Sequence, residues 1–190
     1  MARLQGLSAD EARRFRTGRP CLDLAHTGGD GRYAVFELIH EPGDVSRWLG
    51  VIAGLDGIEA AGPDVRDTRA LRRAVWNAAH DAIGGHSPAG LDMTAINRAA
   101  ARVPPVPRLE PSGGSSVRRP LTAPQVLSVL ARDAVDLFAG PLASRIRVCA
   151  AADCGLLYVD QSRTGNRQWC SMQRCGTRAK VRAHRERGRS

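Results

Sequence analysis

Residues 149–189 read CAAADCGLLYVDQSRTGNRQWCSMQRCGTRAKVRAHRERGR, and four of the five cysteines of the chain lie in this stretch. They form two close pairs, Cys149-x4-Cys154 and Cys170-x4-Cys175, separated by fifteen residues. Each pair suits one tight turn, and the gap is long enough for the two turns to face each other. In structural sites, zinc prefers four ligands such as cysteine thiolates, arranged in a closed tetrahedron. The spacing therefore predicts one structural Zn²⁺ ion on these four thiolates, with no open position for catalysis.

Other uses of the cysteines are possible but weaker. Free buried thiols or a redox pair would explain the residues without a metal, and the same thiolates could hold iron. A segment of about 40 residues buries too little apolar surface to fold alone, whereas structural zinc contributes about 10 kcal/mol or more. The fifth cysteine, Cys21, has no cysteine near it in the sequence, and we expect it to be a buried apolar thiol.

Positive charge is concentrated in the same C-terminal part of the chain. Residues 145–190 hold 11 of the 28 Lys and Arg residues but 3 of the 19 acidic ones, which is +8 of the net +9. The first 144 residues are therefore almost neutral. This asymmetry favours a polyanionic partner for the cysteine-rich module, and nucleic acid is the simplest one.

The last part of the module has helical spacing. Ser171 is placed to cap a helix that would run from Met172 to Arg187. Four arginines of this helix, at i, i+4, i+8 and i+11, would fall within a stripe of about 80°. A solvated helix face would explain the stripe as well, but the concentrated charge favours phosphate contacts. The candidate nucleic-acid-binding residues are Arg167, Arg174, Arg178, Lys180, Arg182 and Arg185.

Upstream, apolar residues at helical spacing and Pro or Gly punctuation predict helices over 42–52, 63–83, 87–102 and 122–139. Residues 103–120 contain five prolines and a Gly-Gly-Ser-Ser centre, which indicates a hairpin or an irregular loop. Residues 33–36 are predicted to be extended, and 21–27 fit either a strand or a buried helical turn. The predicted fold is mainly α. Residues 1–140 would form a helical domain with small β elements, and residues 145–190 a treble-clef-like zinc finger.

The run Cys154…Tyr158-x-Asp160…Trp169-Cys170-Ser171-Met172-x-x-Cys175-Gly176-Thr177-Arg178 resembles the CGNR zinc-finger family. Members of that family carry an N-terminal ABATE domain, described as a stress-induced transcription regulator, and the Cys21-Leu22-Asp23-Leu24 segment is similar to it. The resemblance implies zinc on the four cysteines and DNA binding. Two positions depart from the family pattern, with Thr177 in place of an asparagine and His26-Thr27 in place of Asn-Thr.

The leading hypothesis is a zinc-dependent DNA-binding transcription regulator acting on double-stranded DNA, whose N-terminal domain senses a small-molecule effector or forms a homo-oligomer. The alternative is an RNA- or protein-interaction module associated with the ribosome or RNA polymerase. We do not expect an enzyme, because the sequence shows no nucleophile–base pair, glycine-rich phosphate loop or open metal site. No apolar run reaches the roughly 18–20 residues of a membrane span, so we expect a cytoplasmic, nucleoid-associated protein.

Overall fold

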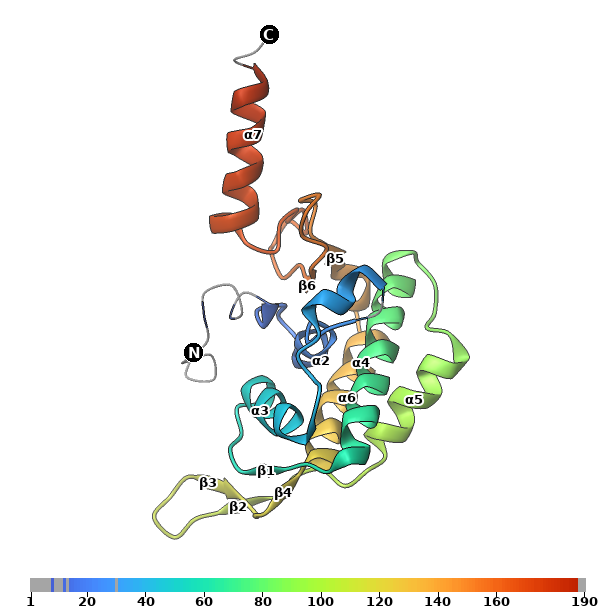
Figure 1. Cartoon of the computed structure of the whole chain (residues 1–190), viewed down its shortest axis with the longest axis vertical. Helices are drawn as coiled ribbons and strands as arrows, with labels where there is room; N and C mark the ends of the chain where they lie inside the picture. The colour runs from blue at the N-terminus through green and yellow to red at the C-terminus, as the bar shows by residue number, and fades with distance from the viewer. Residues whose placement is uncertain (1–7, 9–11, 13, 30, 188–190) are drawn as a thin grey trace.

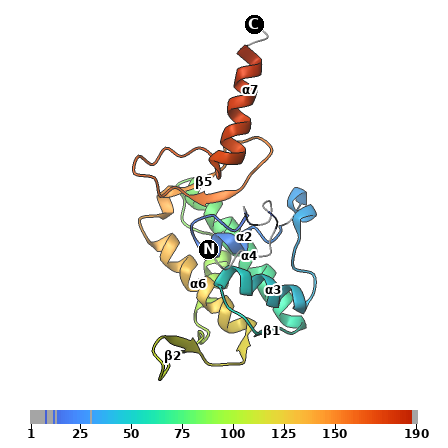
Figure 2. The ribbon, with the colours of Figure 1, turned by 90° about the vertical axis from the view of Figure 1, so that its left-hand side faces the viewer.

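The computed structural model describes residues 8, 12, 14–29 and 31–187. A bundle of helices forms the body, and the C-terminal finger stands at one end with its last helix projecting away (Figures 1 and 2). The prediction of a mainly α fold is confirmed. The helices are α2 (Pro20–Ala25), α3 (Pro42–Ala53), α4 (Gly62–Ile83), α5 (Gly90–Ala100), α6 (Ala123–Ala139) and α7 (Thr177–Arg187). Shorter turns are the 3-10 helices η2 (Gly31–Phe36) and η3 (Ala143–Arg145) and the π-helical turn η4 (Met172–Gly176).

The three longest helices of the body begin where the sequence predicts. Each has a proline in its first turn, and the third residue of each accepts a hydrogen bond from the N-cap backbone N–H. Asp44, Asp64 and Gln125 make this bond at 3.1, 2.8 and 3.0 Å. Each bond gives the N-cap N–H a partner at a helix start, where backbone donors lack intrahelical acceptors. Within the described residues, no helix combines the length and apolar character needed to cross a bilayer.

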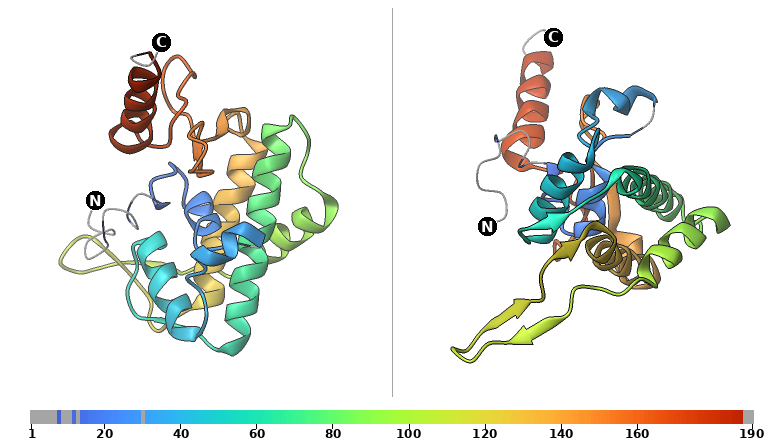
Figure 3. Two further views of the ribbon diagram at one scale, coloured as in Figure 1. Left: turned by 45° about the horizontal axis from the view of Figure 1, so that its top comes forward. Right: turned by 60° about the horizontal axis from the view of Figure 1, so that its bottom comes forward.

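The strands are short and form three separate pairs. Strand β1 (Ile58–Glu59) runs parallel to β4 (Leu121–Thr122). Strands β2 (Pro107–Leu109) and β3 (Ser115–Val117) form an antiparallel hairpin that extends from the body as an arm (Figure 3). This outcome selects the hairpin from the two structures that the sequence allowed for residues 103–120. Strands β5 (Ile146–Val148) and β6 (Leu157–Val159) pair antiparallel within the finger.

Two local predictions were wrong. Residues 33–36 form the end of a 3-10 helix and not a strand, with the Glu37 N–H donating to Ala34 O at 3.1 Å. Val35 is 80% exposed, so neither burial nor a paired strand favours an extended backbone here. Helix α5 begins at Gly90 and not at residue 87, because Asp81 of the preceding helix accepts the Ala89 N–H at 3.1 Å. The ambiguous segment 21–27 is largely the buried helix α2.

One hydrophobic core joins the body to the finger. It is built from helices α2 to α6 and also contains Ile146, Leu157 and Val159 of the β5–β6 hairpin. The Val159 N–H donates to Thr17 O at 2.8 Å, which extends the contact beyond apolar packing. The finger is therefore anchored on the body through the hairpin, while α7 projects away from the body (Figure 2).

Candidate metal centre and nucleic-acid interface

The finger brings the four predicted ligands together. Cys149 follows β5, Cys154 closes the turn before β6, and Cys170 and Cys175 lie on either side of the start of η4. Their Sγ atoms all lie within 4.8 Å of one another, with Cys154 to Cys170 at 3.6 Å and Cys170 to Cys175 at 3.8 Å. A tetrahedron with Zn–S bonds of about 2.3 Å has edges of about 3.8 Å. The donor set therefore fits zinc, and the four cysteines form the zinc-binding site.

The thiols are strongly coupled because they lie so close together. The side-chain hydrogen bond with Cys170, which opposes the effect of burial, lowers the pKa of Cys154 to about 4. The same bond, together with burial, raises the pKa of Cys170 well above its usual range. A bound divalent cation would remove this competition for protons among the four thiols, because a cation deprotonates its thiol ligands. The Cys170 N–H also points at Cys149 Sγ at 3.4 Å, which supports a thiolate there.

Arg167, a predicted nucleic-acid contact, is occupied within the finger. Its Nε donates to Trp169 O at 2.8 Å and its Nη2 to Cys170 O, so the guanidinium holds the backbone that carries the third ligand. The same group lies 4.5 Å from the centre of the Tyr158 ring. The Tyr158 hydroxyl in turn donates to Arg167 O at 2.5 Å. These contacts give Arg167 a structural role that spacing alone did not reveal.

Asp160 fixes the turn that follows β6. Its carboxylate is buried and accepts the Ser162 N–H at 2.9 Å and the Arg167 N–H at 2.9 Å. Hydrogen bonds from Ser162 are the main reason that the pKa of Asp160 is lowered. The loop from β6 to the third cysteine is therefore organised around one ionised carboxylate.

Arg178 is the arginine nearest to the metal ligands on α7. Its Nη1 lies 2.8 Å from Asp153 Oδ2, and its Nη2 lies 3.7 Å from Cys175 Sγ. Asp153 belongs to the turn between the first two cysteines, so the ion pair connects both halves of the site. A guanidinium beside the thiolate partly compensates the double negative charge of a Zn(Cys)4 centre. The sequence signal for this role of Arg178 is that it follows Cys175, the fourth ligand, by three residues.

The C-terminal helical segment begins at Met172, as predicted, but the predicted Ser171 side-chain cap and the α geometry of the first turn were wrong. Ser171 makes no side-chain capping hydrogen bond, and residues 172–176 form a π-helical turn that places Cys175 at the metal. Regular α geometry begins at Thr177. The arginine stripe is therefore divided, with Arg174 half-buried in the π turn and the later basic residues on α7.

Helix α7 projects from the finger into solvent (Figures 1 and 2). Among the described elements, its main packing contact is with the π turn before it. The exposed basic residues on it are Arg178, Lys180, Arg182, Arg185 and Arg187.

His26 joins the body to the finger, and the sequence gave no sign of this role. The side chain is 6% exposed, and its Nε2 accepts the N–H of Leu157 at 3.0 Å. Its ring also makes an edge contact with Trp76 of α4, with ring centres 5.9 Å apart. The departure of His26-Thr27 from the family pattern marked this position but not its contact.

Two family models match the chain, one after the other. Residues 18–141 match ABATE, described as "Putative stress-induced transcription regulator". The chain belongs to this family. Residues 145–188 match the CGNR zinc finger, so the resemblance seen in the sequence is confirmed. Both are regulatory or zinc-finger families by their descriptions and not enzyme families, and the chain is a zinc-binding member of the family so described. A search of curated proteins found no match.

Proposed function

We propose that this ABATE protein binds double-stranded DNA through α7 and acts as a zinc-dependent transcription regulator. The observation that carries the proposal is the projection of α7 from the body with its basic side chains exposed. A helix of eleven residues is about 16 Å long and, with side chains, about 10–12 Å wide. The major groove of B-DNA is about 12 Å wide and admits such a helix.

Charge on more than one face of α7 suits a groove better than a flat surface. Arg178, Arg182 and Arg185 lie on one face, while Lys180 and Arg187 lie nearly opposite at about 100° per residue. A helix in the major groove has a phosphate strand on each side, so basic residues on both faces can pair at once. Glu186 is the single acid in α7. The zinc site orients this helix but leaves no open coordination position for chemistry.

The proposed contacts divide by position. Lys180, Arg182 and Arg185 extend from the projecting helix and would make the main phosphate contacts. Arg174 and Arg178 at its base would add contacts where the DNA backbone approaches the finger. Arg167 is the weakest candidate of the original set because its guanidinium holds the backbone of the third ligand.

Single-strand recognition, one form of the alternative RNA-binding function, has little support. Proteins of that type stack bases on exposed aromatic rings. The aromatic residues of the finger are Tyr158 and Trp169, of which Tyr158 is 1% exposed and Trp169 packs beside the metal cluster. We place the protein in the cytoplasm with the nucleoid. We assign effector sensing or homo-oligomer formation to the ABATE domain.

A salt titration of DNA binding tests the proposal. Fluorescence anisotropy with labelled duplex DNA should give a log–log slope of about −3 to −5, as expected for about four neutralised phosphates. Arg182→Gln should reduce the magnitude of this slope by about 1. Arg108→Gln on the exposed β2 strand removes the same charge from the body and serves as the control. Absence of DNA binding at low salt, or equal effects of the two variants, would refute the proposal.

A further inference from the structure

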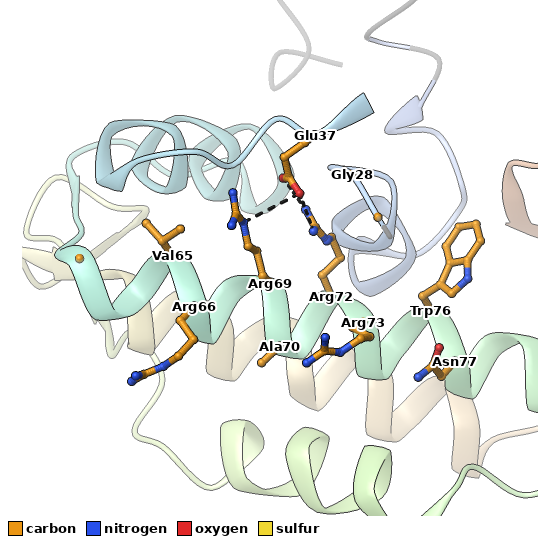
Figure 4. Close-up of a pocket in the computed structure, with 12 residues that line it drawn as sticks. Gly28, Glu37, Val65, Arg66, Arg69, Ala70, Arg72, Arg73, Trp76 and Asn77 are labelled. Carbon is orange, nitrogen blue, oxygen red and sulfur yellow. Dashed lines mark hydrogen bonds and ion pairs between the residues drawn. The ribbon is translucent and has the colours of Figure 1, made fainter. Parts of the chain in front are cut away.

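The ABATE part of the chain carries two features outside the finger, a cavity and an arm. The cavity, of about 710 Å³, lies over α4 and beside the segment that holds Gly28 and Glu37 (Figure 4). The arginines that line it have partners within the chain. Arg72 bonds both carboxylate oxygens of Glu37 at 2.7 Å, and Arg69 bonds Ile39 O at 2.9 Å. The cavity therefore points to no particular ligand, whereas the arm points to a partner.

The arm is the antiparallel hairpin of β2 and β3, which extends from the body at the end away from α7 (Figures 1 and 3). All three residues of β2 and two of the three in β3 are exposed. A hairpin of two strands is only marginally stable by itself in water, and three or more strands or a covering helix make it stable. Added strands from outside the chain would therefore stabilise the arm.

The hydrogen bonds inside the hairpin decide which backbone groups face outward. At the base of the arm, the Arg118 N–H donates to Val106 O at 3.3 Å. At its tip, the Glu110 N–H donates to Gly114 O at 3.2 Å. In an antiparallel pair, residues bonded in this way alternate with residues whose N–H and C=O point away from the partner strand. The outward-facing residues of the two strands are Pro107, Leu109, Ser115 and Val117.

The two edges of the arm differ in their ability to pair. On β2, Pro107 has no N–H to donate at its outward position, and proline at such a position protects an edge from further strands. On β3, Ser115 and Val117 each present both an N–H and a C=O. Within the described residues, no other strand of the chain pairs with this edge. The β3 edge is therefore the one that is open to an added strand.

We propose that the β3 edge pairs with the β3 edge of a second copy of the chain, antiparallel about a two-fold axis at Ser116. Ser115 of each copy then lies opposite Val117 of the other, and the two pairs exchange four backbone hydrogen bonds. Two arms thus form one four-stranded sheet. This assignment deepens the homo-oligomer formation proposed above for the ABATE domain and rests on that proposal for its biological meaning.

Charge complementarity selects a second copy of the chain as the occupant. Arg118 follows Gly114, the residue beside Glu110, by four positions, so Glu110 and Arg118 lie about 13 Å apart along their own hairpin. In the proposed pairing, the partner's Arg118 lies opposite Gly114 and on the face of the sheet that carries Glu110. The two-fold axis therefore gives two ion pairs between copies that one hairpin does not make alone.

The space between these two charges is open. Apart from its chain neighbours, no heavy atom lies within 4 Å of the place where Gly114 would carry a Cβ. The Glu110 carboxylate leans across toward β3, where the Ser116 hydroxyl donates to it. Arg118 is exposed, and among the described residues no carboxylate of its own chain pairs with it. A second arm can therefore approach β3 without displacing a side chain at Gly114.

The proposed pairing is independent of DNA binding. The arm and α7 lie at opposite ends of the molecule, so the pairing does not involve the finger (Figure 1). The experiments on the arm contain no DNA, and the salt titration described above does not depend on the arm. Failure of either proposal would therefore leave the other standing.

Sedimentation velocity of the zinc-loaded full chain without DNA tests the pairing. An edge contact between two short strands lies below the roughly 1,200 Å² of stable complexes, so we expect a weak dimer with a Kd of about 0.1 mM. Between about 5 μM and about 1 mM, the mass should rise from the 20.4 kDa of one chain toward twice that value. A mass that stays at one chain up to about 1 mM would overturn the assignment.

Two proline variants identify the edge that pairs. Ser115→Pro removes an outward N–H from β3 of each copy, and thus two of the four bonds, and should raise the Kd about tenfold or more. Leu109→Pro is the matched control, because it removes an outward N–H from β2 and should leave the Kd unchanged. Unchanged circular dichroism would show that both variants are folded. Equal effects of the two variants, or a larger effect of Leu109→Pro, would contradict pairing through β3.

A charge exchange tests the register with side chains that lie outside the core. Glu110→Lys alone and Arg118→Glu alone each bring like charges together across the axis, and each should raise the Kd about tenfold at low salt. An equimolar mixture of the two variants should restore the dimer, because every contact between the two different chains then joins opposite charges. A mixture that remains dissociated would refute the proposed pairing.

Discussion

Removal of zinc should unfold the outer half of the finger and leave its inner hairpin on the body. The perturbation is a strong chelator added to the full chain or, more selectively, Cys175→Ser. The reason is that Ile146, Leu157 and Val159 of the hairpin belong to the core of the body and not to the metal cluster. Chelation therefore removes support from the cysteines, the loop before Cys170 and α7, but not from β5 and β6.

The energies differ enough to decide the outcome. The cluster around the cysteines contains one large fully buried side chain, Tyr158, worth about 1.5–3 kcal/mol. Structural zinc contributes about 10–16 kcal/mol, so without it the outer half has no net stability. The three aliphatic side chains of the hairpin together contribute about 5–9 kcal/mol that does not depend on the metal. Helix α7, with eleven residues, is too short to persist alone.

Hydrogen exchange measured amide by amide can separate the two halves. The N–H groups of Leu157 and Val159 donate to His26 and Thr17 of the body and should keep their protection without zinc. The N–H groups of Arg167 and Gly176 are bonded inside the outer half and should exchange at nearly free rates. Circular dichroism should show a matching loss of one helix of eleven residues.

The matched control is Ser171→Ala. It lies between the third and fourth ligands, makes no capping bond, and should retain zinc and full protection. If Leu157 and Val159 exchanged as fast as Arg167 after chelation, the hairpin would depend on the metal and the core assignment would be refuted. If Gly176 stayed protected without zinc, the metal would not be what orients α7.

Three other changes have expected outcomes. Glu37→Gln should lower the free energy of unfolding at pH 7 by about 3 kcal/mol in denaturant titrations, because it leaves Arg72 buried without a carboxylate. Because the pKa of Glu37 is lowered in the folded state, its carboxylate stabilises the fold fully above about pH 4.5, and this stabilisation is lost as pH falls through the folded-state pKa. The free energies of unfolding at acid and at neutral pH should therefore differ less in Glu37→Gln than in the unmodified protein. His26→Ala should cost about 1–3 kcal/mol by the same assay, since the Leu157 N–H loses its acceptor; no change would show that water replaces the imidazole. Deletion of residues 177–187 should abolish DNA binding in anisotropy assays while zinc content, measured by atomic absorption, stays at one ion per chain.

The sequence predicted those elements whose signals are local. Thr122 and Gln125 make a capping box that needs no tertiary contact, and α6 begins there. The cysteine pairs are similar, because zinc requires a fixed number of thiolates and the spacing shows them directly. The hairpin of residues 103–120 could also be predicted as one of two structures, because its turn residues restrict the backbone by themselves.

The remaining features depend on contacts between distant residues. The π-helical turn at Met172–Gly176, which lies between the third ligand and the start of α7, has no local signal in the sequence. The start of α5 is set by Asp81 on another helix, and the 3-10 helix at Gly31–Phe36 has no periodic pattern. The arginine-lined cavity was also missed, because Glu37 and α4 are brought together by the fold.

The basic residues of the finger serve two purposes that net charge alone does not separate. Arg167 holds the backbone of a metal ligand, and Arg178 pairs with Asp153 beside the metal. Charge used in this way is partly compensated before any nucleic acid approaches, so it releases fewer counterions on binding. The salt slope should therefore follow the exposed residues of α7 and not the +8 of the whole finger. A slope near −4 would be consistent with this division, whereas a slope near −8 would mean that the charge of the whole finger is neutralised by phosphates.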